Sequence, residues 1–113
     1  MKIPILFIVF NRPDTTKRVF SAITKARPYK LFIAADGPRK NVVGEKLLCD
    51  EVRKIVAEID WPCEVKRHYN NTNSGCKKAV SEAIDWFFRN VNEGIILEDD
   101  CLPTPDFFEF IMK

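Results

Sequence analysis

The sequence predicts an α/β fold in which a mostly parallel sheet carries helices on both faces. Four short apolar segments alternate with three segments whose apolar residues recur at the spacing of a helix face. The first apolar segment, residues 5–10, is continuous and rich in β-branched and aromatic residues, which is typical of a central strand covered on both sides. Strands that alternate with helices are joined in parallel by right-handed crossovers. We therefore expect a three-layer, Rossmann-like architecture with the strand order 3-2-1-4.

Turn and capping residues set the expected boundaries of the elements. Pro13 and Asp14 fit the first turn of a helix, Gly37-Pro38 ends a strand, and Pro62 follows the end of another helix. The strand expected around residues 63–69 alternates only weakly, so it belongs nearer the sheet edge. The expected strands cover residues 5–10, 30–35, 63–69 and 94–98, and the expected helices cover residues 13–26, 45–59 and 76–91.

The apolar face of each expected helix follows the helical spacing. In the first helix these residues are Thr16, Val19, Phe20 and Ile23. In the second they are Leu48, Val52, Ile55, Val56 and Ile59. In the third they are Ala79, Val80, Ala83, Ile84, Phe87 and Phe88.

A further helix is expected to begin at residues 104–106, where an N-cap residue, a proline and an acid precede an apolar face. The sequence stops before this helix reaches a C-cap. We therefore expect the chain to be a truncated part of a longer protein. The exposed truncated face suggests a homo-oligomer as a further expectation.

Length and composition indicate one small domain that spans residues 1–113. A hydrophobic content of 46% suffices for a packed core, and a formal net charge of +2 without a basic tract disfavours general electrostatic binding of nucleic acid. The apolar run at residues 3–10 is interrupted by Pro4 and is far shorter than the roughly 20 residues that span a membrane. No membrane span is expected.

The four cysteines lack the close spacing of a structural zinc site, and His68 is the single histidine. Reduced, largely buried thiols in a cytoplasmic protein are the expected state. Two disulfides remain an alternative that sequence alone leaves open.

Polar residues stand where three of the expected strands end. Asn11 and Arg12 follow the first strand, Asp36 and Gly37 follow the second, and residues 98–100 follow the fourth. Parallel sheets bind ligands outside the carboxyl ends of their strands, at the point where the strand order reverses. The coincidence predicts a functional site at this edge of the sheet.

Three consecutive carboxylates, Glu98, Asp99 and Asp100, repel one another unless a cation or polar ligand compensates their charge. In an extended segment Glu98 and Asp100 point one way and Asp99 points the other. One or two of them can coordinate Mg²⁺ or Mn²⁺ together with the phosphates of a nucleotide diphosphate. The alternative is a solvated acidic turn that caps the following helix.

The other candidates also have ordinary structural alternatives. Asp36 suits a base N–H or a ribose hydroxyl but is equally a turn-forming residue, and Arg12 is a phosphate or base contact or a surface arginine. Gly75 and Lys77 stand at the start of a helix, which favours anions. Lys77 and Lys78 are alternatively a solvated helix face. The sequence contains neither a G-x-G-x-x-G dinucleotide motif nor a P-loop.

Residues 31–39, 73–76 and 98–100 together resemble the donor-binding half of a GT-A glycosyltransferase, a nucleotide-diphospho-sugar transferase. The segment from Ile96 through residues 105–110 is similar to the inverting N-acetylglucosaminyltransferase I family. Overall, the chain is similar to prokaryotic proteins described as glycosyltransferase-like or haemolytic-protein-like. The resemblance implies a GT-A-type fold. The expected location is the cytoplasm of a prokaryote, with a peripheral position at the membrane as the alternative.

The resemblance also implies roles for individual residues. Asp100 matches the metal ligand, which binds Mn²⁺ or Mg²⁺, although the motif here is E-D-D rather than strict D-x-D. Glu98 and Asp99 match acids that contact the ribose and nucleotide, Asp36 matches an acid near the base, and Arg12 matches a nucleotide contact. Gly75 falls near the loop that lines the nucleotide pocket. Together with the strand-end argument, the expected contacts of the nucleotide-sugar are Asn11, Arg12, Asp36, Gly37, Gly75, Lys77, Glu98 and Asp99.

In such an enzyme the acceptor, a saccharide or another hydroxyl compound, and the catalytic base belong to the half that follows this sequence. We therefore expect the 113 residues alone not to transfer sugar. The leading hypothesis is a UDP-sugar-binding half of a metal-dependent hexosyltransferase. The alternatives are a non-catalytic nucleotide- or ligand-binding module of the same fold and an interaction or haemolysis-associated protein.

Overall fold

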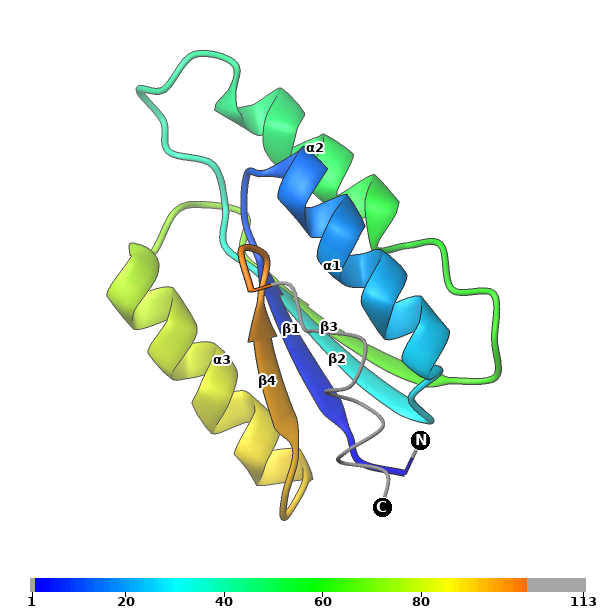
Figure 1. The fold of residues 1–113 in the computed structure, drawn as a ribbon. Coiled ribbons are helices and arrows are strands. Elements are labelled where there is room, and N and C mark those ends of the chain that lie inside the picture. The colour runs from blue at the N-terminus through cyan, green and yellow to red at the C-terminus, as the bar shows by residue number, and fades with distance from the viewer. Residues whose placement is uncertain (1, 102–113) are drawn as a thin grey trace.

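The computed structural model describes residues 2–101 and contains the predicted alternation of strands and helices (Figure 1). The order of the elements along the chain is β1 (Ile5–Val9), α1 (Pro13–Ala26), β2 (Lys30–Ala35), α2 (Glu45–Ile55), β3 (Glu64–Tyr69), α3 (Cys76–Asn90) and β4 (Ile95–Glu98). The helix expected from residue 104 lies outside the described residues, and so does the face through which oligomers were expected.

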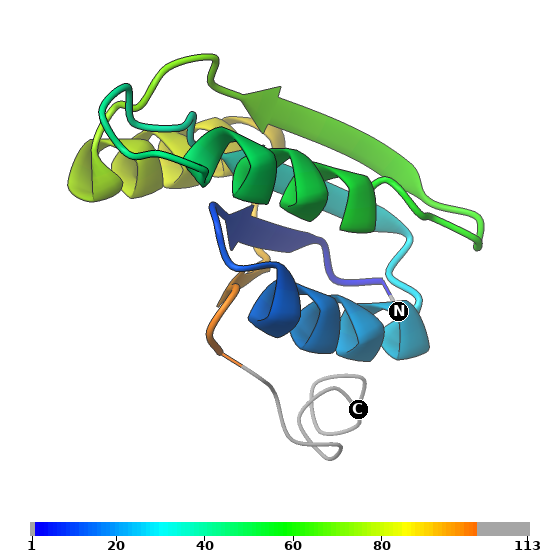
Figure 2. The same cartoon turned by 90° about the horizontal axis from the view of Figure 1, so that it is seen from above.

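The four strands form one parallel sheet in the order β3-β2-β1-β4, which confirms the predicted fold class and strand order. The order reverses between β1 and β4, because the chain moves outward from β1 to β3 and then returns to the other side of β1. Helices α1 and α2 cover one face of the sheet, and α3 covers the other (Figures 1 and 2).

Side-chain alternation along the central strands divides the core into two layers. In β1, Phe7 belongs to the cluster under α1 and α2, and its neighbour Leu6 belongs to the cluster under α3. In β2, Ile33 and Phe32 divide in the same way. Both central strands are therefore buried on two sides, which is the physical reason for their continuous apolar sequence.

Helix α1 follows the prediction closely. Thr16, Val19, Phe20 and Ile23 are its buried residues. The helix ends at Ala26, and Arg27 takes a left-handed conformation with φ of 50° while its backbone N–H donates to the carbonyl oxygen of Ile23. This C-cap orients the chain for β2.

Helix α2 ends at Ile55, four residues before the predicted end. Ala57 and Glu58 donate to carbonyl oxygens three residues earlier instead of continuing the α-helical ladder. Ile59 still packs against the core, which explains why its apolar character was mistaken for helix.

Two predicted face residues are substantially exposed. Leu48 in α2 is 41% exposed and Phe88 in α3 is 45% exposed. In α2 the buried positions include Cys49 and Glu45 instead. The apolar stripes predicted from sequence were therefore wider than the surfaces that the sheet buries.

All four cysteines are free, as expected. The expectation that they are largely buried was wrong, because Cys49 is buried but Cys76 and Cys101 are exposed. These two residues lie at the start of α3 and after β4, where the chain leaves the packed layers. Within residues 2–101, no helix is both long and apolar enough to cross a membrane.

The contact between α3 and the sheet depends on Phe87, which is fully buried and meets the ring of Phe32 edge-on at a centroid distance of 5.0 Å. We expect Phe87→Ala to lower the free energy of unfolding by about 3–5 kcal/mol, because it removes a large buried ring and leaves a cavity. The adjacent Phe88→Ala should cost about 0.5–1.5 kcal/mol, since this ring is half-exposed and contacts mainly Phe87. Denaturant unfolding of both variants measures the difference, and equal losses would contradict this packing.

Candidate functional site

A cavity of about 200 Å³ lies at the carboxyl ends of the strands, where the strand order reverses. It brings together six predicted site residues from three separate parts of the sequence. They are Asn11, Arg12, Asp36, Glu98, Asp99 and Asp100. Because β1, β2 and β4 are parallel neighbours or near neighbours, the polar residues that follow them converge at one edge of the sheet.

Three other predicted residues lie outside the lining of this cavity. Gly75 and Lys77 line a separate, shallow cleft at the start of α3. Gly37 is the close-contact point between two loops, since a Cβ atom there would lie 2.6 Å from the backbone of Thr72. The predicted contacts of these residues with a nucleotide-sugar remain predictions.

Gly75 has a conformational role at the N-cap of α3. Its φ of 91° and ψ of 147° are rarely accessible to residues with a Cβ atom. Its backbone N–H donates to the side-chain oxygen of Asn73 at 3.0 Å. The glycine therefore allows the loop after β3 to turn into the helix.

Asp36 is buried and connects the loops that follow β2 and β3. Its Oδ1 accepts hydrogen bonds from the backbone N–H of Gly37 at 2.9 Å and of Ser74 at 3.0 Å. The side-chain amide of Asn70 also donates to Oδ1, and that of Asn73 donates to Oδ2, each at 3.1 Å. Both carboxylate oxygens thus hold the wall of the cavity together.

Arg53 supports this arrangement from α2. Its Nη2 atom donates to the carbonyl oxygens of Asp36 at 3.2 Å and Asn70 at 2.8 Å. Its guanidinium carbon lies 4.7 Å from the centre of the Tyr69 ring. The ends of β2 and β3 are therefore linked to α2 as well as to each other.

Glu45 begins α2, is only 2% exposed, and joins that helix to the end of β1. Its carboxylate accepts hydrogen bonds from the backbone N–H and guanidinium Nε of Arg39, at 2.8 and 2.9 Å, and from the side-chain amide of Asn11 at 3.1 Å. Asn11 lines the cavity, but this amide is already engaged. Its predicted contact with a nucleotide-sugar would use its amide oxygen or the second N–H of the amide.

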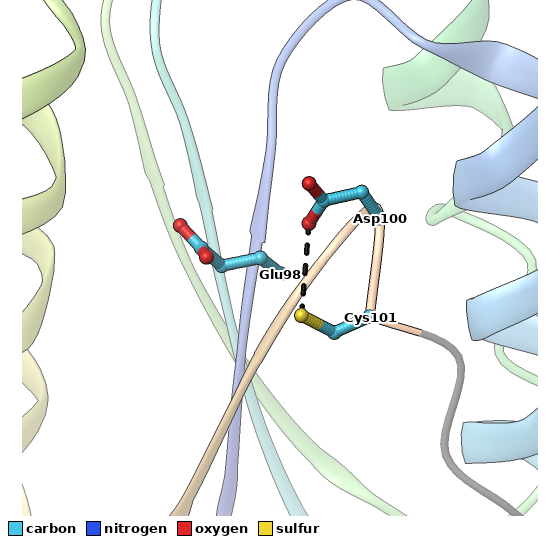
Figure 3. A group of neighbouring side chains, drawn as sticks. All are labelled: Glu98, Asp100 and Cys101. Atoms are coloured by element: carbon cyan, nitrogen blue, oxygen red, sulfur yellow. Dashed lines mark hydrogen bonds between the residues drawn. The ribbon is translucent and has the colours of Figure 1, made fainter.

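Glu98 is the last residue of β4, and Asp99 and Asp100 lie in the turn that follows it, so the three acids do not form one extended segment. The backbone N–H of Cys101 donates to the carbonyl oxygen of Glu98 at 3.1 Å, which closes the turn. Glu98, Asp100 and Cys101 are exposed, and each offers a ligand atom within 4.8 Å of the others (Figure 3). Glu98 and Asp100 were expected to point the same way because of strand alternation, whereas here a turn brings their ligand atoms close together. Such a group could hold a metal ion, although exposed acidic groups also cluster without one.

The electrostatics of the turn include one cation. Nη1 of Arg12 lies 3.7 Å from Oδ2 of Asp100, and both side chains are more than half exposed. Asp99 is half-buried, and burial raises its pKa, opposed by Arg12 and reinforced by Asp100 and Glu98. Desolvation and the charge of Asp100 also raise the pKa of the Cys101 thiol.

Sequence reasoning missed several residues that shape the cavity. Glu45 was assigned only as the start of a helix, and His68 only as a histidine without a zinc partner. Asn70 was not singled out, and Asn73 entered only as part of the segment 73–76 that carries the resemblance. The available signal for His68 was the alternation of β3, weak as it is, because alternation assigns each residue to one face of the sheet. His68 pairs in register with Ala34 and lies on the same face as Ala34. No comparable signal identified the partners of Glu45.

No protein-family model matches this chain, and no curated protein or solved structure matches it either. Its functional assignment therefore depends on the residues of the cavity and their geometry.

The connection between Glu45 and Arg39 predicts a specific dependence of stability on pH. Hydrogen bonds from the Arg39 side chain, followed by the backbone hydrogen bond from Arg39, lower the pKa of Glu45 from 4.5 to about 2. A carboxylate with a lowered folded-state pKa stabilises the fold above its unfolded pKa and loses that contribution as pH falls through its folded pKa. We expect this stabilisation to be complete above pH 4.5 and lost towards about pH 2.

Glu45→Gln tests this expectation, because glutamine keeps the shape of the side chain but carries no charge. The variant should be less stable than the parent chain at neutral pH, and the two stabilities should converge as pH approaches 2. Denaturant midpoints measured across this range show the effect. Glu51→Gln, at an exposed position of the same helix, is the matched control. A constant difference between Glu45→Gln and the parent chain at all pH values would contradict the role of the charge.

Proposed function

We propose that this chain binds a nucleotide-diphospho-sugar, with UDP as the nucleotide, through a divalent cation as part of a glycosyltransferase of the hexosyltransferase class. The observation that supports this proposal is the convergence of Arg12, Asp36 and residues 98–100 on one cavity at the carboxyl ends of parallel strands. This is the position at which open α/β sheets bind their ligands. The motif resemblance described above supplies the chemical class of the ligand.

The cation in this proposal is Mn²⁺ or Mg²⁺, held by Asp100 with support from Glu98. Carboxylate oxygens are the ligands that these hard cations prefer, and Mg²⁺ in particular is usually held by one or two carboxylates plus substrate phosphates. The turn after β4 is exposed and leaves room for phosphate oxygens to complete the coordination shell. Cys101 is a softer ligand and is not required for this cation.

Arg12 is the second group proposed to contact the diphosphate. Its side chain is 60% exposed, and its guanidinium lies beside Asp100 at the cavity. An exposed ion pair of this kind contributes little to folding stability. Arg12 is therefore free to exchange part of its contact with Asp100 for a bidentate contact with phosphate oxygens.

In the complete reaction the acceptor hydroxyl would attack the anomeric carbon of the sugar as its proton passes to a base, and the bond between that carbon and the diphosphate oxygen would break. The bound cation supplies compensation for the negative charge that develops on the departing diphosphate. The residues of this chain hold and orient the donor. The acceptor would be a saccharide or another hydroxyl compound, and residues 2–101 provide no group that we assign as the base.

Calorimetric titration of UDP with and without Mn²⁺ tests the proposal. We expect Mn²⁺ to strengthen UDP binding and Asp100→Ala to weaken Mn²⁺-dependent binding by about tenfold or more. Mutating residues that only support a metal ligand already lowers metal affinity by about 10- to 100-fold, so loss of the ligand itself should cost at least as much. Asp60→Asn removes an exposed carboxylate before β3 and should leave binding unchanged. Cys101→Ser should also retain Mn²⁺-dependent binding, because the thiol is not part of the proposed oxygen shell.

Two results would contradict the proposal in different ways. UDP binding that ignores both Mn²⁺ and the Asp100→Ala substitution would indicate the alternative, a nucleotide-binding module without a metal. Failure of the parent chain to bind UDP at any Mn²⁺ concentration would remove the nucleotide as the ligand.

A further inference from the structure

One side of the cavity is apolar and lies between the sheet and α3. It is formed by Ile8 of β1, Ala34 of β2, and Ala79 and Val80 of α3, and we call it the apolar side of the cavity. Ile8 and Ala34 belong to the cluster under α3, which places this side between the sheet and that helix. Glu98 at the end of β4 and Asp99 and Asp100 in the following turn line the same cavity, so it combines acidic groups with the apolar side.

His68 adds one polar group to the apolar side of the cavity. It lines the cavity and pairs in register with Ala34, so its side chain is on the face of the sheet that α3 covers. The imidazole ring packs against Trp86 of α3, with a centroid distance of 5.3 Å and an interplanar angle of 36°. The imidazole ring thus contacts Trp86 and also lines the cavity.

The Nε2 atom of His68 is buried and has no hydrogen-bond partner among residues 2–101. A buried polar atom without a partner costs free energy, and native structures seldom keep one unless a water or ligand satisfies it. Because His68 lines a cavity, a ligand seated there could supply that partner.

The polar side chains near His68 in the cavity lining already have hydrogen-bond partners within the chain. The Asp36 carboxylate accepts the four contacts from Gly37, Asn70, Asn73 and Ser74 described above. The side-chain amide of Asn73 is further held by the carbonyl oxygen of Gly37 at 3.0 Å. Among these lining residues, His68 is therefore the one with a buried polar atom that a ligand could satisfy.

We infer that His68 is a specificity-determining residue, whose imidazole forms a hydrogen bond with a planar nitrogen-containing ring bound against the apolar side of the cavity. This inference rests on the proposed function, in which the ring is the nucleobase of the donor. A neutral imidazole has one donor and one acceptor nitrogen, which match the alternating donors and acceptors of a nucleobase edge. The terminal torsion of histidine has broad energy wells, so Nε2 can turn towards such a ring.

Uridine and inorganic pyrophosphate separate the two halves of the ligand. Uridine carries the base without phosphate, and pyrophosphate with Mn²⁺ carries the phosphates without a base. His68 is the single histidine of the sequence, so its imidazole proton signals in an NMR spectrum are unambiguous. We expect uridine to shift these signals in the parent chain, and the shift to saturate during titration without Mn²⁺.

His68→Phe is the informative variant, because it keeps an aromatic ring against Trp86 but removes both nitrogens. It should weaken uridine and UDP binding by about five- to tenfold, the effect of losing one hydrogen bond. Binding of pyrophosphate with Mn²⁺ should not change. Lys66→Ala, two residues earlier on β3 with its ammonium over the Phe32 ring and outside the cavity lining, is the matched control and should bind all three ligands normally.

Three outcomes would overturn the role of His68. They are the absence of a uridine-induced shift in its signals, unchanged uridine binding by His68→Phe, and an equal loss of uridine and pyrophosphate binding in that variant. Failure of the proposed metal function gives a different result. In that case pyrophosphate binding does not depend on Mn²⁺ or Asp100, while uridine binding still depends on His68.

Discussion

The carboxylate of Asp36 is the interaction on which the wall of the cavity depends. It accepts hydrogen bonds from the loop that begins at Gly37 and from the loop that leads to Gly75, so the ends of β2 and β3 are held at one separation. Gly37 permits this arrangement because any larger residue would collide with the backbone of Thr72. The several hydrogen-bond donors around this buried carboxylate compensate for its burial, and removing the carboxylate would leave those donors without partners. The same contacts hold Asn70 beside the cavity, and the pairing of β3 with β2 places His68 there.

Charge in this region is divided between scaffold and site. Asp36 and Glu45 are buried and are engaged by neighbouring backbone, amide and guanidinium groups, so they contribute to the structure of the loops. Arg12, Glu98 and Asp100 are exposed and have weaker contacts, so their charges are available to a ligand. The proposed binding of a metal and a diphosphate uses the second group, and the proposed recognition of a ring uses His68. The buried charged residues thus hold the loops of the site in place, and the exposed ones are those proposed to contact a ligand.

The sequence predicted the fold and the polar residues that gather at one edge of the sheet, for one physical reason. Continuous apolar strands and helical spacing determine which segments pack, and parallel strands bring their carboxyl ends to one edge. Six polar residues named from that reasoning do line one cavity. Gly37, Gly75 and Lys77 lie beside it, because proximity to a strand end or helix start does not specify the direction in which a residue faces. Glu45 was missed because its partners Asn11 and Arg39 come from different loops.

By itself, the sequence determined the order of strands and helices, the two-sided burial of β1, and the edge of the sheet at which polar residues gather. Local periodicity and turn chemistry carry that information, and they act over a few residues. The tertiary structure alone decided that the Asp36 carboxylate is hydrogen-bonded to the loops after β2 and β3, and that Nε2 of His68 lacks a partner within residues 2–101. These properties depend on atoms more than 30 residues apart for Asp36, and on side-chain packing across the sheet for His68. No spacing rule in the sequence specifies such contacts, because they form only when the layers are assembled.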